Sequence, residues 1–132
     1  MEYMQMGGWA MWLVLLLDGL LLPIVLLVGI GVIAMRVTGK FPSVSKGLAV
    51  VTLLACFLPG CAGLLGYWQG ASMVDAAVVY ADPEQRAMLQ EVGYAEAGMN
   101  LYFGGGSVCL LAGIAMIGVM VSMTQRDSYE VE

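Results

Sequence analysis

Three long apolar segments dominate the chain, and most polar positions lie between them or at the ends. The segments cover about residues 7–35, 47–68 and 96–123, and at about 1.5 Å per residue each can cross a hydrocarbon core of about 30 Å. The residues between the last two, about 69–95, are less apolar but still favour helix. The pattern therefore predicts an all-α membrane protein, a single transmembrane domain with three transmembrane helices, of which the second and third extend beyond the membrane.

A turn at Asp82–Pro83 separates the second predicted helix from the third. Asp82 suits the N-cap, Pro83 suits the first helical position, and Gln85 completes a pattern that resembles a capping box. The third helix is predicted to run from Pro83 to about Met123, which is much longer than a membrane requires. Its first part should project into water beside the end of the second helix.

Composition strengthens this prediction and excludes several classes of protein. Of 132 residues, 61% are hydrophobic and only 11% are charged, whereas about a quarter of a soluble domain is charged. Histidine is absent, and the three cysteines do not have metal-ligand spacing. No nucleophile–base pair or phosphate loop is recognisable either. We therefore expect no enzyme activity, no cofactor, no metal and no nucleic-acid partner; lipids and other membrane subunits are the expected partners.

The distribution of cations predicts how the chain is oriented. Arg36, Lys40 and Lys46 fall in the predicted first loop, between about residues 36 and 46, and Arg126 follows the third span. Only Arg86 lies on the other side. The positive-inside rule then places the N-terminus outside and the C-terminus in the cytoplasm, with the helical extension on the outer side.

Polar and small residues form a stripe on the third helix. Glu96, Asn100, Gly104 and Ser107 recur at helical spacing and therefore share one face. Such a stripe on an apolar helix requires a partner helix or a water-filled path. Glu96 and Asn100 are thus candidates for an ion pathway. The alternative for Glu96 is a charge at the water interface that caps the membrane segment.

Asp18 lies inside the first apolar segment and is a third ion-pathway candidate. A carboxylate at the centre of a membrane helix costs about 2.5–3.5 kcal/mol on insertion scales, so it should face protein or water. It could serve as an ion or proton site, as a hydrogen-bonding residue between helices, or as a hydrated residue near the surface.

Glycines at helical spacing predict close helix packing on the second and third helices, because a missing side chain lets backbones approach. The candidates are Gly63, Gly66, Gly70, Gly104, Gly105 and Gly106.

Two stretches resemble the MotA/TolQ/ExbB family of proton-channel subunits. GGWAMWLVLLL at Gly7–Leu17 is similar to the opening of that family's first span, and the stretch Gly63–Asn100 is similar to its second-span exit, outer loop and following helix. Glu96, in GYAEAG, falls where the family has a carboxylate in GIAEAL. The resemblance implies a multi-pass protein of the bacterial inner membrane. It also implies a pentamer in which Glu96 and Asn100 face a central axis and meet a single-span TolR/ExbD-like partner.

The chain also departs from that family. About ten residues replace the family's large cytoplasmic domain, and Tyr67 and Leu101 stand where the family often has threonines. From the resemblance, the expected function is that of a proton-channel or stator subunit that couples ion flux to a partner machine. One alternative is a structural membrane scaffold with the same fold that has lost conduction. Another is a holin-like pore-former, although such proteins usually end in a basic tail and this chain ends in DSYEVE.

Overall fold

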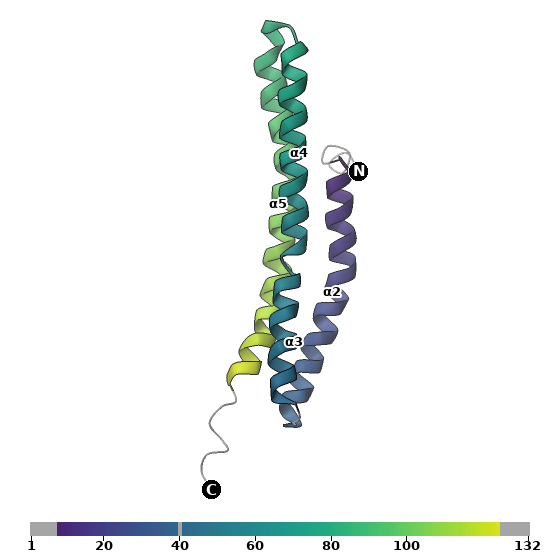
Figure 1. Cartoon of the computed structure of the whole chain (residues 1–132), viewed down its shortest axis with the longest axis vertical. Coiled ribbons are helices and arrows are strands. Elements are labelled where there is room, and N and C mark those ends of the chain that lie inside the picture. The colour runs from purple at the N-terminus through teal and green to yellow at the C-terminus, as the bar shows by residue number, and fades with distance from the viewer. Residues whose placement is uncertain (1–7, 40, 125–132) are drawn as a thin grey trace. The chain divides into compact units, whose positions relative to one another are not determined.

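The computed structural model describes residues 8–39 and 41–124, and this part of the chain is helical with no strand. Figure 1 shows the helices, whose bounds are α2 Gly8–Val37, α3 Pro42–Ala55, α4 Leu58–Tyr80 and α5 Pro83–Thr124. Apolar residues cover these helices on several sides: Leu16, Leu27, Ile30 and Ile117 are each more than 60% exposed. Exposed side chains of this kind suit lipid rather than water.

Three stretches are long and apolar enough to cross a membrane. They are Gly8–Val37 with 30 residues, Ser43–Tyr80 with 38 and Pro83–Met123 with 41. A 41-residue helix is about 60 Å long, roughly twice the thickness of a hydrocarbon core. For the described residues, the prediction of an all-helical fold with three helices long and apolar enough to cross a membrane is confirmed. The inside–outside orientation stays a prediction, and two of its cations, Lys40 and Arg126, lie outside the described residues.

The first connection is shorter than the sequence pattern suggested. The α2 helix continues through Arg36 to Val37, and α3 begins at Pro42, so Lys46 is helical rather than part of a loop. Pro42 occupies the first turn of α3, where a residue without an N–H group costs no hydrogen bond. Gly39, with a φ of 65°, takes the left-handed conformation that ends α2.

A helix break separates α3 from α4, just before Pro59. Pro59 has no N–H group to donate to the carbonyl of Ala55, so the helix cannot continue regularly through this turn. The preceding turn tightens instead, and the N–H of Phe57 donates to the carbonyl of Leu54 at 3.2 Å. The helix resumes at Leu58.

The chain divides into two compact units, Met1–Leu17 with Pro59–Ser107, and Asp18–Leu58 with Val108–Glu132. In the second unit, residues from or next to all three of its helices, α2, α3 and α5, are buried: Leu21, Val25, Val32, Ala49, Cys56, Leu111 and Ala115. The guanidinium of Arg36 donates to the backbone carbonyl of Ser122, which links the last turn of α2 to α5. The helices of this unit therefore pack against one another mainly through apolar side chains.

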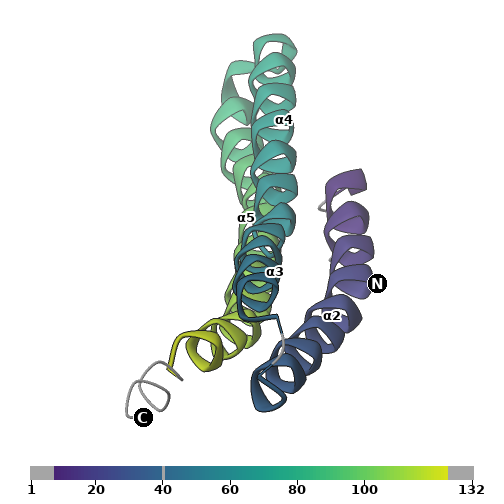
Figure 2. The ribbon, with the colours of Figure 1, turned by 60° about the horizontal axis from the view of Figure 1, so that its bottom comes forward.

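In the first unit, α4 and the N-terminal part of α5 form an antiparallel hairpin, which both views show side by side (Figures 1 and 2). The turn at Ala81–Asp82 joins them, and Pro83 begins α5 as its sequence pattern indicates. Arg86 donates from Nε to the carbonyl of Ala81 at 3.0 Å and therefore caps the end of α4. Lower in the hairpin, the Tyr94 hydroxyl donates to Asp75 Oδ1 at 2.5 Å.

Candidate functional site

Glycines bring the backbones of α4 and α5 into direct contact. A Cβ atom added to Gly63 would collide with the carbonyl oxygen of Asn100 and lie 3.0 Å from the Cα of Gly104. One added to Gly104 would lie 2.8 Å from the carbonyl oxygen of Pro59. Because these atoms belong to the backbone, they cannot rotate away. The two helices can cross this closely only while both positions are glycine.

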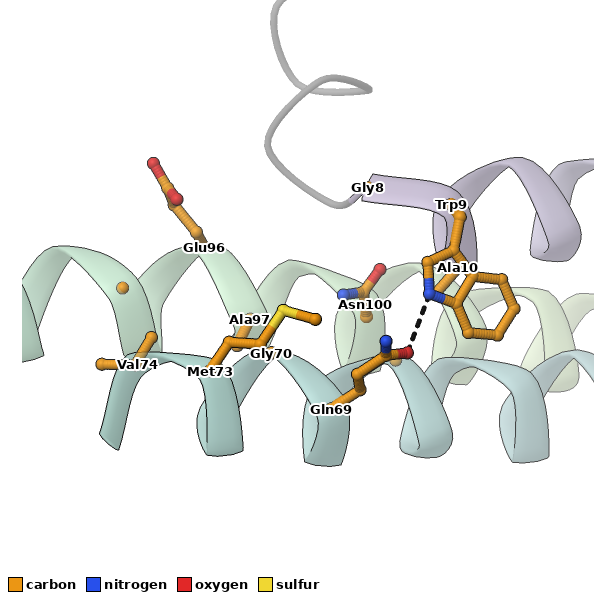
Figure 3. Close-up of a pocket in the computed structure, with 12 residues that line it drawn as sticks. Gly8, Trp9, Ala10, Gln69, Gly70, Met73, Val74, Glu96, Ala97 and Asn100 are labelled. Atoms are coloured by element: carbon orange, nitrogen blue, oxygen red, sulfur yellow. Dashed lines mark hydrogen bonds between the residues drawn. The ribbon is translucent and has the colours of Figure 1, made fainter. Parts of the chain in front are cut away.

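The first turn of α2 joins the hairpin next to this crossing. Ala10 is only 2% exposed, and a Cβ atom on Gly66 would collide with its methyl group. The indole N–H of Trp9 donates to Oε1 of Gln69 at 2.8 Å, as the dashed line in Figure 3 shows. A small residue on each helix and one side-chain hydrogen bond thus hold three segments together.

These segments line an open pocket of about 260 Å³. It is lined by residues 8–10 of α2, residues 66–74 of α4 on the face that includes Gln69, and residues 93–100 of α5 on the face that includes Glu96. Glycine and alanine form much of the wall, because Gly70 and Ala97 pack against each other: a Cβ on Gly70 would lie 2.9 Å from the Ala97 methyl. The pocket therefore owes its space to small side chains.

Asn100 is the buried polar residue of this pocket. Its side chain is 4% exposed, and Figure 3 shows its amide between α5 and the first turn of α2. Within the part of the chain that the structure describes, no donor hydrogen-bonds to its Oδ1 atom. Most buried polar atoms in proteins have a partner. An amide oxygen left without one therefore indicates a donor from outside the described chain.

Glu96 lies one helical turn before Asn100, and Figure 3 shows both side chains rising from the same side of α5. Glu96 is half-buried and is the only acidic residue among the described residues that line the pocket; none of them is Lys or Arg. The pocket thus has a negative charge with no cation in its wall. Sequence spacing predicted that Glu96 and Asn100 share a face, and the pocket places them together.

Asp18, the third candidate, belongs to the second unit and is half-buried on α2. It is not among the residues that line the pocket. The polar stripe on α5 ends at Ser107, whose hydroxyl donates to the carbonyl of Phe103 at 2.9 Å within its own helix. Glu96 and Asn100 are therefore the part of the predicted pathway that the structure brings into one site.

The six glycines fall into two groups. Gly63, Gly66, Gly70 and Gly104 lie at contacts between helices of the first unit, whereas Gly105 and Gly106 have no atom within 4 Å of an added Cβ. A packing role for this second pair stays a prediction, and it would have to concern contacts outside the single chain.

Trp9 and Gln69 are site residues that the sequence reasoning missed. A tryptophan near the start of an apolar segment is typical of the aromatic belt at a membrane surface, so its position alone does not indicate a site. One local signal was present: Gln69 lies three residues after Gly66 and one before Gly70, so it borders the glycine face of its helix. Nothing local connects it to Trp9, which lies 60 residues earlier.

Within the described residues, no three His, Cys, Asp or Glu side chains come together as a metal site would require. Comparison with known proteins gives no further assignment, since no family model, no curated protein and no solved structure matches this chain. We therefore infer function from the chemistry of the pocket alone.

Proposed function

We propose that this chain is a subunit of a homo-oligomeric membrane assembly in which Glu96 exchanges protons with water held beside Asn100. The observation that carries the proposal is the buried amide oxygen of Asn100, which has no donor in the described chain. Leaving such a group unsatisfied costs about 1–3 kcal/mol. A water molecule is the simplest donor, since Asn100 borders a pocket that is large enough to hold one. The oxygen itself has less than 1 Å² of accessible surface, so its side chain must shift slightly to accept from that water.

Water next to a carboxylate within an apolar helix is the arrangement that a proton relay requires. The crossing at Gly63 and Gly104, however, leaves no room for water between α4 and α5 beyond Asn100. A path would therefore have to continue outside the hairpin. Along α5, Gly98, Gly105 and Gly106 leave space on the helix surface that another subunit could line. This supports an assembly of several copies; the family resemblance suggests a pentamer with a single-span TolR/ExbD-like partner, in the bacterial inner membrane.

Proton flux into liposomes tests the proposal. The purified protein is reconstituted, a potassium gradient with valinomycin supplies the driving force, and an enclosed pH-sensitive dye reports proton entry. We expect flux in the wild type, a fall to the level of empty liposomes for Glu96→Gln, and a strong reduction for Asn100→Leu. Glu91→Gln is the matched control, because Glu91 is an exposed carboxylate on the same helix that does not line the pocket.

Flux that persists unchanged in Glu96→Gln would contradict the proposal. Absence of flux in the wild type would favour a second function, a membrane scaffold that has the same helices but does not conduct. The closed crossing at Gly63 and Gly104 is the observation that favours this alternative. A scaffold should still assemble with a fixed copy number, which native mass spectrometry of the detergent-solubilised protein measures, and Glu96→Gln should leave that number unchanged.

A further inference from the structure

The pocket is larger and less polar than proton exchange requires. Its volume is about 260 Å³, whereas one water molecule occupies about 30 Å³ in the liquid. Met73, Val74 and Ala97 contribute apolar surface, and the polar groups are concentrated at Glu96, Asn100 and Gln69. A space of this kind suits a small organic molecule with one polar end.

The polar groups of the pocket determine which polar end fits. Glu96 supplies a carboxylate, and Asn100 supplies an amide oxygen without a donor. Gln69 Oε1 already accepts from Trp9. Among the described lining residues there is no Lys or Arg to neutralise the carboxylate. The Glu96 carboxylate and the Asn100 oxygen are both acceptors on one face of α5, so a group that carries N–H donors and a positive charge is complementary to this pair.

We propose that this pocket binds a small primary ammonium group. An ammonium carries three N–H donors, one positive charge and no acceptor, which matches a carboxylate and an unsatisfied amide oxygen one helical turn apart. Its carbon chain would lie against the apolar wall formed by residues such as Met73 and Ala97. Hydrogen bonds to a charged partner are the stronger ones in proteins, so most of the affinity should depend on Glu96.

The ammonium could be free in solution or carried by a lipid headgroup such as ethanolamine. Trp9 lies in the pocket near the start of a membrane-spanning helix, where the sequence predicts the membrane surface. Lipid headgroups are found at that level. The inference does not require proton conduction, but if the proposed function holds, a bound ammonium competes with protons for Glu96 and lowers flux.

Trp9 lines the pocket and can report on it, although 55% of its surface is exposed. The other two tryptophans, Trp12 and Trp68, are 60% and 72% exposed, so replacing both by Phe should leave the fold intact and Trp9 as the single fluorophore. This variant is incorporated into nanodiscs of phosphatidylglycerol, a lipid without an amine. Ethanolamine hydrochloride is titrated at pH 7, with ethylene glycol as the neutral ligand of equal size and sodium chloride as the ionic control.

We expect a saturable change in Trp9 emission with ethanolamine and none with ethylene glycol or sodium chloride. Glu96→Gln should weaken binding by about 10- to 100-fold, because a charge-assisted hydrogen bond is lost. Asn100→Leu should weaken it by about 10-fold, because the ammonium is a charged donor to the amide oxygen. Glu91→Gln should bind like the parent. Circular dichroism of each variant shows whether its helices are retained.

Three results would overturn the inference. They are no saturable response in the parent, an equal response to sodium chloride, and equal weakening by Glu91→Gln and Glu96→Gln. None of these measurements uses a proton gradient, so their failure is distinct from failure of the proposed conduction. The titration with ethanolamine is then repeated in nanodiscs that contain phosphatidylethanolamine. If Trp9 emission already has its saturated value before ethanolamine is added, the lipid headgroup is the ligand. If the titration curve is unchanged, the ligand is a free amine.

Discussion

Two adjacent glycines of α5 allow a sharp test of how the first unit is packed. A Cβ atom on Gly104 would lie 2.8 Å from the carbonyl oxygen of Pro59 and 3.0 Å from the Cα of Gly63. A Cβ atom on Gly105 would meet no atom within 4 Å. The same substitution, glycine to alanine, therefore adds a methyl group against a backbone at one position and into open space at the next.

The expected difference follows from two contributions. Alanine is favoured over glycine in a helix interior by up to about 1 kcal/mol, and both variants gain this equally. At position 104 the two backbones must also move apart, and overpacking of this kind costs about 1–3 kcal/mol. Gly104→Ala should therefore be less stable than Gly105→Ala by about 1–3 kcal/mol. Gly105→Ala itself should equal or exceed the wild type in stability.

Unfolding by sodium dodecyl sulfate in dodecyl maltoside micelles, followed by far-ultraviolet circular dichroism, measures this difference. The midpoint should shift while the slope stays constant, which marks a change in stability rather than in the unfolded state. If Gly104→Ala proved as stable as Gly105→Ala, the two helices would not cross at these glycines. Repeating the titration at tenfold lower protein concentration separates contacts within one chain, which are unaffected, from contacts between copies at Gly105.

The remaining predictions concern single hydrogen bonds. Trp9→Phe keeps an aromatic ring but loses the hydrogen bond to Gln69. It should lower the free energy of unfolding by about 0.5–1.5 kcal/mol in the same titration. Gln69→Leu should have a similar effect, and the double variant should lose no more than either single variant; additive losses would contradict a direct bond. Arg86→Ala removes the donor to the carbonyl of Ala81 and should cost about 0.3–1 kcal/mol, with faster amide hydrogen exchange confined to the hairpin turn; unchanged exchange there would exclude a capping role. Asn100→Leu removes an acceptor that has no donor in the described chain and keeps a similar shape, so it should leave the stability unchanged or raise it by up to about 1–3 kcal/mol; a loss of stability would show that another group of the chain hydrogen-bonds to the amide.

Much of the fold could be predicted because apolar segments of this length have few alternatives. A segment of 20 or more apolar residues in lipid must satisfy its backbone groups internally, which selects a helix. The start of α5 at Pro83 follows from the local chemistry of Asp82 and proline. The early start of α3 did not follow from hydrophobicity, because residues 42–46 include two serines and a lysine, yet Pro42 at a first helical position is a signal that sequence alone contains.

The candidate site could be predicted only in part, for a physical reason. Helical spacing is enough to place Glu96 and Asn100 on one face of α5, because both lie on a single element. The bond between Trp9 and Gln69 depends on how two distant segments pack, and tryptophan at a membrane boundary has a sufficient local explanation. The unsatisfied oxygen of Asn100 is equally non-local, since it depends on Ala10 and Gly66 closing the space around it.

Packing alone does not explain an asparagine at position 100. Its side chain fits against Gly66, where an added Cβ would lie 3.1 Å from its Cγ atom, and leucine has nearly the same shape with no hydrogen bond to satisfy. A buried amide oxygen with no donor in the described chain needs one from elsewhere, which a water molecule, an ammonium group or another subunit can supply. If Asn100→Leu gains stability while losing proton flux or amine binding, the asparagine serves the pocket and the surrounding glycines serve to create it.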